Sequence, residues 1–165
     1  MSSRHTAFIG LGSNLTDPCN QVLRGLQALD DLPHTKVLAR SSLYRSAPLD
    51  YLQQPDFINA VAKLETALSP RALLDALLQL ERESGRTREF RNAPRTLDLD
   101  VLLYDDMQHH EHGLTIPHLQ MHKRAFVLRP LLEIMPDGVI PGVGAAADAL
   151  LLCADQQLER IADAR

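Results

Sequence analysis

The order in which strand-like and helix-like patterns succeed one another is the feature that most restricts the fold of this chain. Short apolar runs and amphipathic stretches follow as β-α-β-β-α-β, with further segments after the last strand. This is the order of a ferredoxin-like α+β sandwich, in which helices cover one face of an antiparallel sheet. The predicted strands span residues 6–11, 36–44, 57–64 and 96–104, and the predicted helices begin at Thr16 and Ser69, with shorter helices at 128–135 and 145–153.

The chain is long enough to form one independent core. Its 165 residues, 45% hydrophobic and 23% charged, predict a single domain spanning 1–165 and exclude wholesale disorder. There is no apolar run long enough to cross a membrane and no signal-peptide pattern. Cys19 and Cys153 are too few for a disulfide framework, so we expect a cytoplasmic protein. The sequence does not decide whether residues 153–165 form an ordered segment or a disordered tail.

The positive charges are unusual in kind, although the net charge is −4. The negative balance argues against a general nucleic-acid-binding protein. Arginine, which binds carboxylates and phosphates through paired hydrogen bonds, supplies 14 of the 17 Lys and Arg residues. A cluster of arginines suits a polyphosphate ligand, and a solvated charged surface is the ordinary alternative. The cluster consists of Arg82, Arg86, Arg88, Arg91 and Arg95.

Two aspartates follow this cluster on a predicted strand. In Asp98-Leu99-Asp100 the carboxylates occupy positions i and i+2, so both project from one face while Leu99 faces the core. Like charges at this spacing repel each other unless a cation lies between them, and such oxygen ligands suit Mg²⁺. For an isolated Asp-x-Asp, the solvated edge of a strand is the more frequent explanation. The neighbouring arginines instead favour metal-assisted chemistry of a polyphosphate.

Two other patterns indicate structure rather than chemistry. Gly10-Leu11-Gly12 follows a strand, as in dinucleotide-binding proteins, but the third glycine of that motif is missing. We interpret it as a tight turn between strand and helix, close to the site. His109, His110 and His112 lack the companion residues of a metal cluster, so we expect them in a solvated loop.

Several short motifs are spread along residues 6–141 and are densest between Gly85 and Phe126. They are Gly12-Ser13-Asn14, Gln54-Pro55-Asp56-Phe57-x-Asn59, Gly85-Arg86-x-Arg88, Pro94-Arg95-Thr96-Leu97-Asp98-Leu99-Asp100, Leu114-Thr115-Ile116-Pro117-His118 and Lys123-Arg124-x-Phe126. In these motifs the chain resembles the hydroxymethyl-dihydropterin pyrophosphokinases of folate biosynthesis. The run Pro-Arg-Thr-x-Asp-x-Asp followed by Pro-His is highly specific to that family.

The resemblance implies an activity as well as a ferredoxin-like fold. Such an enzyme transfers pyrophosphate from ATP to the hydroxymethyl group of 6-hydroxymethyl-7,8-dihydropterin and releases AMP, with Mg²⁺, in tetrahydrofolate synthesis. The resemblance implies a monomer whose partners are the pterin and ATP, with no nucleic acid and no membrane.

The resemblance also implies roles for individual residues. Two Mg²⁺ ions would be held by Asp98 and Asp100. The triphosphate would face Arg86, Arg95 and Arg124. Residues that contact ATP or support its pocket would be Glu81, Arg88, Thr115 and His118. The pterin ring would lie between Phe57 and Phe126, with its polar edge read by Asn59 and by backbone near Ser46 and Leu49.

The chain departs from the family pattern at four places. Asn92-Ala93 stands where the family often has a Trp, and Leu78 where it often has a polar residue. Gly113 replaces a basic residue and Leu119 an aromatic one. We therefore expect the contacts with adenosine to differ from those of the family, and the metal chemistry to be unaffected.

Two alternatives are consistent with the same residues. One is a non-catalytic ferredoxin-like module that binds RNA or an acidic partner through its arginines. The other is an Asp-x-Asp nucleotidyltransferase, which would release pyrophosphate. The net charge and the few aromatic residues, four Phe and three Tyr with no Trp, weaken the RNA alternative. Formation of AMP with a pterin acceptor separates all three.

Overall fold

The computed structural model describes residues 3–15, 17–48, 55–84 and 97–162. Among them, six strands form one sheet: β1 (His5–Ser13), β2 (Thr35–Arg40), β3 (Leu43–Ser46), β4 (Phe57–Thr66), β5 (Asp98–Tyr104) and β10 (Leu158–Ala162). Their order is β10-β3-β4-β1-β5, with β2 also paired to β4, and all neighbours are antiparallel. Helices α1 (Pro18–Asp30) and α2 (Pro70–Ser84) make the two crossovers, which confirms the predicted ferredoxin-like fold.

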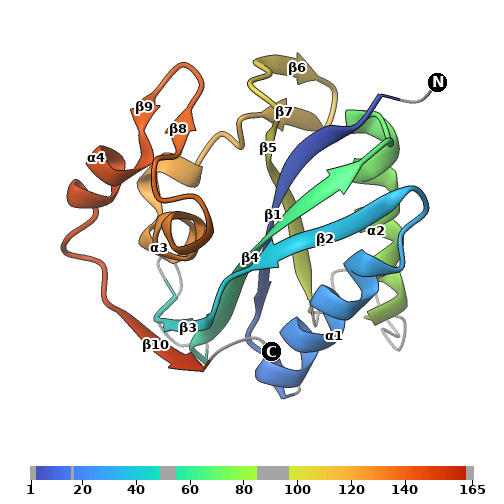
Figure 1. Cartoon of the computed structure of the whole chain (residues 1–165). Coiled ribbons are helices and arrows are strands. Elements are labelled where there is room, and N and C mark those ends of the chain that lie inside the picture. Colours follow the sequence, from blue (N-terminus) through green and yellow to red (C-terminus); the bar gives the residue numbers. More distant parts are fainter. Residues whose placement is uncertain (1–2, 16, 49–54, 85–96, 163–165) are drawn as a thin grey trace.

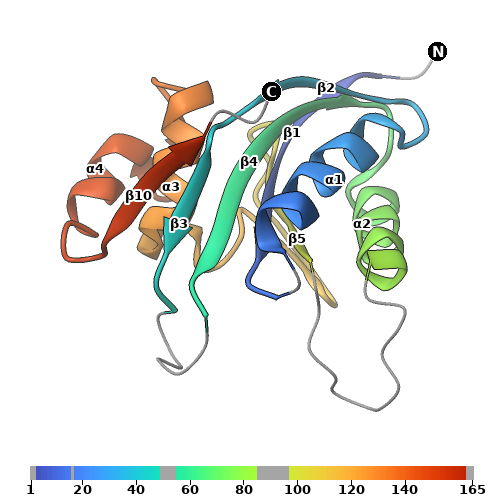
Figure 2. The ribbon, with the colours of Figure 1, turned by 90° about the horizontal axis from the view of Figure 1, so that it is seen from below.

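Helices cover both faces of this sheet. α1 and α2 lie on one face, while α3 (Ala125–Ile134) and α4 (Ala146–Leu151) lie on the other (Figures 1 and 2). The sequence predicted helices on one face only, because the C-terminal segments carry no local signal of where they pack. Each helix layer has its own cluster of buried apolar side chains. The sheet is therefore the middle layer of three.

The central strand β1 shows how one sequence serves both layers. Ala7, Ile9 and Leu11 belong to the cluster under α1 and α2, whereas Phe8 belongs to the cluster under α3 and α4. This alternation follows from the period of two in a strand. Gly10 and Gly12 continue the α3 side of the strand without side chains.

The strand predicted at 36–44 is divided into β2 and β3. Ser41, between them, donates its backbone N–H to the carbonyl of Val61 at 2.9 Å, and its Oγ accepts the N–H of Val61 at 2.9 Å. A side-chain oxygen thus replaces a backbone carbonyl as the partner of β4. The prediction of one continuous strand is wrong, because apolar periodicity does not reveal such a substitution.

α3 is tied to β3 by the carboxylate of Glu133. The backbone N–H of Ser42 donates to Oε1 and Oε2 at 3.0 and 3.1 Å, Ser42 Oγ donates to Oε2 at 2.8 Å, and the Tyr44 hydroxyl donates to Oε1 at 2.7 Å. Burial alone would raise the pKa of Glu133, but the hydrogen bonds from Tyr44 and Ser42 outweigh it and lower that pKa. We call Glu133, Ser42 and Tyr44 the Glu133 clamp.

The clamp makes stability depend on pH in the alkaline range. Burial and the hydrogen bond to Glu133 raise the pKa of Tyr44 from 10.0 to about 12. Because the folded-state pKa is the higher one, the stabilisation is fully present below pH 10 and is lost as the pH rises to 12. The free energy of unfolding should therefore fall more steeply between pH 10 and 12 in the wild-type protein than in Tyr44→Phe. Urea unfolding of both proteins across this range measures the difference, and parallel pH profiles would contradict it.

Several segments predicted as loops, or left undecided, pair with each other. In the tail, residues 158–162 form β10 against β3. Strands β6 (His109–Glu111) and β7 (Leu114–Ile116) form a hairpin, as do β8 (Val139–Ile140) and β9 (Gly144–Ala145), and η1 (Met121–Lys123) is a short 3₁₀ helix. The prediction of a loop is therefore wrong at residues 109–111, whereas His110 and His112 are exposed to solvent as expected. None of the helices in the described ranges is long and apolar enough to cross a membrane.

Candidate functional site

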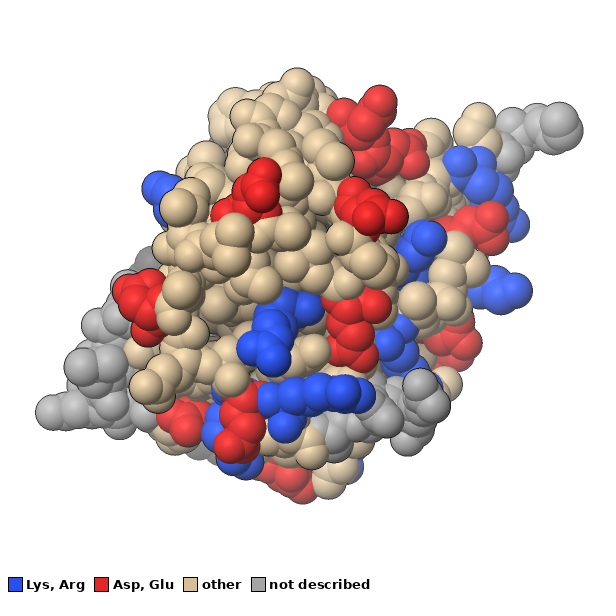
Figure 3. Space-filling view, turned by 60° about the vertical axis from the view of Figure 1, so that its left-hand side comes forward, with Lys and Arg blue, Asp and Glu red and all other residues tan. Residues whose placement is uncertain are grey.

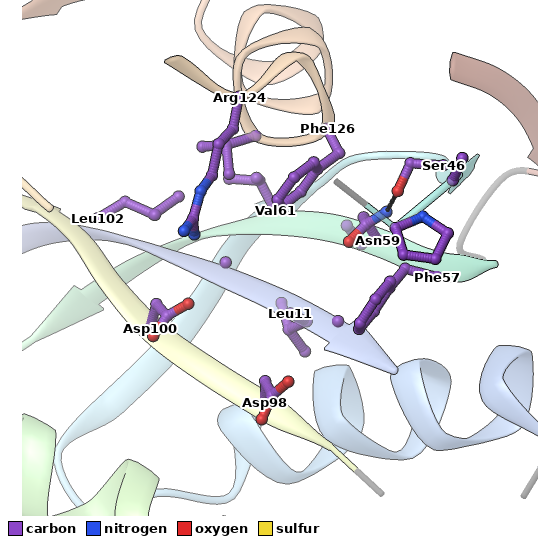
Figure 4. A pocket seen from close by; sticks show the side chains of 16 residues that line it. Leu11, Ser46, Phe57, Asn59, Val61, Asp98, Asp100, Leu102, Arg124 and Phe126 are labelled. Atoms are coloured by element: carbon purple, nitrogen blue, oxygen red, sulfur yellow. Dashed lines mark hydrogen bonds between the residues drawn. The ribbon is translucent and has the colours of Figure 1, made fainter. Parts of the chain in front are cut away.

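A cavity of about 230 Å³ lies on the α3 side of the sheet, between β4, β1, β5 and the start of α3 (Figure 4). Residues predicted as site residues from distant parts of the sequence line it together. They are Ser46, Phe57, Asn59, Asp98, Asp100, Arg124 and Phe126. We call it the first cavity.

Glycines of β1 form part of the lining of the first cavity. Gly10 and Gly12 lie opposite Asp100 and Asp98 in the β1–β5 register, and Gly12 also lies opposite Asn59 on β4. A Cβ on Gly12 would lie 3.2 Å from Asn59 Oδ1, and one on Gly10 would lie 3.3 Å from the end of the Leu102 side chain. The glycines are thus inside a strand and not in a tight turn, which corrects the sequence interpretation. They let a ligand approach the backbone of the sheet.

One wall of the first cavity carries negative charge. Asp98 and Asp100 are exposed and project from the same face of β5, whereas Leu99, between them, is buried on the other face. The period of two along the strand places them in this way, as predicted. The pair offers hard oxygen ligands next to open solvent.

The backbone between these aspartates is held by Glu81. Among the described strands β5 lies at the edge of the sheet, with β1 as its neighbour, so its outward-facing N–H groups have no strand partner there. Glu81, 8% exposed near the end of α2, accepts the Leu99 N–H on Oε2 at 2.7 Å. The resemblance had implied a contact with ATP or support of its pocket. The hydrogen bond to Leu99 was not predicted, because its two partners belong to different elements and lie 18 residues apart in the sequence.

The opposite wall is aromatic and basic. Arg124 and Phe126 extend from the start of α3 toward the cavity and face the aspartates across it (Figure 4). The guanidinium carbon of Arg124 lies 5.6 Å from the centre of the Phe126 ring. Phe57, the first residue of β4, contributes a second aromatic side chain to the lining.

A buried amide occupies the polar end of the first cavity. Asn59 Nδ2 donates to Ser46 Oγ at 2.7 Å, and the two residues are 3% and 5% exposed. This bond fixes the amide orientation, so that Oδ1 lies on the side of Gly12. Ser46 was expected to contribute through nearby backbone, and its hydroxyl also orients Asn59.

A second cavity, of about 280 Å³, shares Asp100 with the first. It holds Thr115 and His118, and its other lining residues are Leu74, Val101, Gly113, Leu114 and Leu119. His118 Nδ1 accepts the N–H of Gln120 at 3.2 Å, which leaves Nε2 to carry the proton of the neutral ring. Burial lowers the pKa of His118. The negative charge of Asp100 raises this pKa and the positive charge of Arg124 lowers it, and the net direction is downward. His118 is therefore a neutral donor beside a carboxylate.

The hairpin β6–β7 borders the second cavity. His109 Nε2 is hydrogen-bonded to Glu111 Oε1 at 2.7 Å, and Arg71 Nη2 donates to Glu111 Oε2 at 2.6 Å. Hydrogen bonds from His109 and then Arg71 lower the pKa of Glu111. His110 Nδ1 is bonded to Thr115 Oγ1 at 2.9 Å, across the hairpin. The histidines missed by the loop prediction thus hold a cavity wall in place.

Some predicted site residues lie outside the described residues. These are Leu49, Arg86, Arg88 and Arg95, together with the departure at Asn92-Ala93.

The donor set of the site fits Mg²⁺. Within the described ranges, no three His, Cys, Asp or Glu side chains are grouped so that they could hold a metal ion. Two carboxylates on one strand face are nevertheless what Mg²⁺ commonly takes from a protein, since water and substrate phosphates complete its shell. Asp98 and Asp100 are the residues that would hold it.

Comparisons with known proteins agree with this geometry. Residues 8–136 match the family model of 7,8-dihydro-6-hydroxymethylpterin-pyrophosphokinase (HPPK). The chain is 46% identical over 156 residues to the 2-amino-4-hydroxy-6-hydroxymethyldihydropteridine pyrophosphokinase of Haemophilus influenzae, which spans 94% of this chain and 98% of that protein. Its identity to the Pseudomonas aeruginosa protein of the same name is 44% over 154 residues, or 93% and 95% of the two chains.

A solved structure shares the fold. The wild-type HPPK-DHPS of Plasmodium falciparum with pterin and p-hydroxybenzoate superposes with a TM-score of 0.71 at 13% identity, over 92% of this chain and 43% of that one. At this identity the likeness concerns the fold alone. From the family model and the two bacterial relatives, the chain belongs to the HPPK family and is a pyrophosphokinase, an ATP-dependent diphosphotransferase.

Proposed function

We propose that this enzyme transfers the pyrophosphoryl group of ATP to the hydroxymethyl oxygen of 6-hydroxymethyl-7,8-dihydropterin, with Mg²⁺, giving the pterin diphosphate and AMP for tetrahydrofolate synthesis. The observation that carries the proposal is the pair of cavities that meet at Asp100. One has aromatic side chains and a fixed amide, and the other has a neutral histidine and apolar side chains. Two ligands bound there would meet at the two aspartates.

The first cavity suits a pterin. A flat heteroaromatic ring requires flat apolar walls, and Phe57 and Phe126 supply two aromatic side chains. The Asn59 carbonyl oxygen is held by Ser46 and can accept a hydrogen bond from the amino-amide edge of the ring. Ser46 and Leu49 would add backbone contacts, of which Leu49 is outside the described residues.

The second cavity suits the nucleoside end of ATP. Leu74, Leu114 and Leu119 offer apolar surface to a base, and His118 offers Nε2–H to a phosphate near Asp100. The Thr115 hydroxyl adds one polar contact. Glu81 would support this region through its hydrogen bond with the Leu99 N–H of β5.

The reacting groups would lie between the cavities. Two Mg²⁺ ions held by Asp98 and Asp100, when bound, would neutralise the phosphate oxygens and bring the two substrates into line. Arg124 faces the same space and would bind phosphate oxygens through its guanidinium group, together with Arg86 and Arg95, while Arg88 would contact ATP or support its pocket. The chain's own contribution is therefore positioning and charge stabilisation.

The decisive experiment identifies the nucleotide product. Incubation with Mg²⁺, ATP and 6-hydroxymethyl-7,8-dihydropterin should give AMP and pterin diphosphate in equal amounts. Free pyrophosphate with a nucleotidylated product would identify the nucleotidyltransferase instead. No turnover, with tight binding of RNA, would identify the binding module. On the face seen in Figure 3, acidic and basic side chains are interspersed, which does not favour a nucleic-acid surface.

Loss of one aromatic wall should weaken the pterin selectively. In Phe126→Ala we expect pterin affinity to fall by roughly tenfold, within the range of about 1–3 kcal/mol for one stacking partner. Affinity for a non-hydrolysable ATP analogue should stay near the wild-type value, because Phe126 does not line the second cavity. Calorimetric titration of each ligand measures both. Equal weakening of the two ligands would show that Phe126 is instead a core residue.

A methyl group on the glycine opposite Asn59 should also weaken the pterin. Gly12→Ala places Cβ against Asn59 Oδ1, whose amide is already held by Ser46, so the hydrogen-bond acceptor must shift. We expect about a fivefold loss of pterin affinity, equivalent to one hydrogen bond of about 1 kcal/mol. Gly10→Ala is the comparison variant in the same cavity, since the nearest atoms to its Cβ belong to Leu102, at 3.3 Å, and not to Asn59. Equal affinities of the two variants would contradict the role of Asn59.

We also propose that residues 1–165 act as a single pyrophosphokinase domain and as a cytoplasmic monomer. One copy of the chain brings aromatic, amide, carboxylate and histidine side chains to the two cavities. Both cysteines are free, in keeping with a reducing compartment. Light scattering coupled to size-exclusion chromatography measures the molar mass, which should be that of one chain, 18.4 kDa.

A further inference from the structure

We propose that Glu133 is a positioning residue, which sets the width of the first cavity by holding α3 at a fixed distance from β3. This inference rests on the proposed function, because it concerns the cavity assigned to the pterin. α3 carries Phe126 at one end and Glu133 at the other. β3 ends at Ser46, in the cavity, and the clamp residues Ser42 and Tyr44 lie at its beginning. Cavity and clamp are therefore the two ends of one helix–strand pair.

Phe126 and Glu133 project from the same side of α3. They are seven residues apart, which is two helical turns, so Glu133 lies on the face of Phe126 about 10 Å further along the axis. Pro130, between them, removes one hydrogen bond from the helix. The orientation of the first turn thus depends on what the rest of this face contacts.

The position of Glu133 is unfavourable for the helix itself. A carboxylate in the last turn is opposed by the helix dipole, and this turn contains no basic residue. The hydrogen bonds from Ser42 and Tyr44, of 2.7 to 3.1 Å, offset that cost. Ser42 and Tyr44 are only 1% and 4% exposed, so their donors are buried groups that need a partner, whereas Glu133 itself reaches them from the surface. The carboxylate of Glu133 therefore stabilises the contact between α3 and β3 and not α3 itself.

The strand side of the clamp leads to the polar end of the cavity. Tyr44 lies directly opposite Asn59 in the β3–β4 register, and directly opposite residues share a face of the sheet. Two residues beyond Tyr44, Ser46 Oγ accepts the hydrogen bond from Asn59. On the other side, Arg160 of β10 donates to Ser42 Oγ at 2.9 Å. The clamp thus joins the helix that carries one wall to the strand that orients the amide.

The expected consequence is selective for one ligand. A ring that stacks beside Phe126 and hydrogen-bonds to Asn59 needs both groups at one separation, so a shift of α3 relative to β3 weakens one of the two contacts. The second cavity is lined by residues of α2, β5, the β6–β7 turn, β7 and the segment after β7, with none from α3 or β3. A looser clamp should therefore weaken the pterin and leave ATP unaffected.

The test compares two Glu→Gln variants. Glu133→Gln keeps the size of the side chain and removes its charge. Glu159→Gln is the matched control on β10, where the carboxylate pairs with Arg45 at 2.9 Å on the exposed surface. We expect the affinity for 6-hydroxymethylpterin, read from its fluorescence, to fall about tenfold in Glu133→Gln. The KM of Glu133→Gln for the pterin should rise by a similar factor, while its KM for ATP and its kcat at saturating pterin stay close to the wild-type values. Glu159→Gln should match the wild-type protein in all of these measurements.

Two results would overturn the proposal. One is wild-type pterin affinity in a folded Glu133→Gln protein, and the other is an equal loss of affinity for pterin and ATP. If Glu133→Gln does not fold, Tyr44→Phe decides, because it removes one donor and leaves the three hydrogen bonds from Ser42. Unchanged pterin affinity in Tyr44→Phe would then reject the clamp. Failure to form AMP, with pterin binding still dependent on Glu133, would reject the proposed function and retain the clamp.

Discussion

Replacing either Asp98 or Asp100 by Asn should lower kcat by roughly 100- to 1000-fold while the protein remains folded. Each side chain is exposed on the cavity face of β5, so neither contributes to the buried core. Each is expected to hold Mg²⁺ against the phosphates, and loss of a single charge-stabilising group commonly costs about 100- to 1000-fold. The Mg²⁺ concentration for half-maximal rate should rise in both variants. Steady-state AMP formation over a range of Mg²⁺ measures both effects.

The matched control is Asp106→Asn. Asp106 is also exposed and lies just beyond the end of β5, outside both cavities. Its substitution removes the same charge from the same part of the chain and should leave kcat unchanged. A rate within tenfold of wild type in Asp98→Asn or Asp100→Asn would exclude that residue from the metal site. A similar loss in Asp106→Asn would point to overall charge instead.

The sequence predicted those features that depend on local period. Asp98 and Asp100 share a face because they are two residues apart on a strand, whatever the rest of the chain does. The same holds for the apolar face of α2, with Leu73 and Leu77 in the core. The order of these elements was then enough for the ferredoxin-like sheet.

Features that depend on distant partners were not predictable in this way. The break at Ser41 needs the backbone of Val61, and the Glu133 clamp joins residues 91 apart in sequence. The hairpin at His109 depends on cross-strand bonds and on Arg71. β10 forms because β3 offers an unpaired edge, which no property of the tail itself indicates. All of these features depend on hydrogen bonds between segments far apart in the sequence, which the periodicity of apolar residues does not reveal.

The site was predicted for a different reason. Phe57, Asn59, Arg124 and Phe126 carry no local signal of function, and only the resemblance brought them together with the aspartates. The structure places all of them on one cavity. Glu81 shows where a resemblance is less informative, because it indicates that a residue belongs to the site and not what the residue contacts.

Glu81 provides the second large effect, and a pair of variants separates its position from its charge. If its task is to hold the Leu99 N–H, Glu81→Gln should retain that bond through the amide oxygen and keep kcat within several-fold of wild type. Glu81→Ala leaves a buried N–H on an edge strand without this partner, at a cost of about 1–3 kcal/mol in the free energy of unfolding. It also frees the backbone between the two proposed metal ligands, so we expect kcat to fall roughly 10- to 100-fold, as for other groups that orient metal ligands.

The measurements are kcat, the Mg²⁺ dependence of the rate and urea unfolding for both variants. A positioning role requires that Glu81→Ala raise the Mg²⁺ requirement and that Glu81→Gln largely restore it. If Glu81→Gln loses as much activity as Glu81→Ala, the negative charge itself is what the site uses, next to two other carboxylates. If both variants lose stability but neither changes its Mg²⁺ dependence, Glu81 only closes the edge of the sheet. Because the bond is to the residue between the two aspartates, we expect the first of these outcomes.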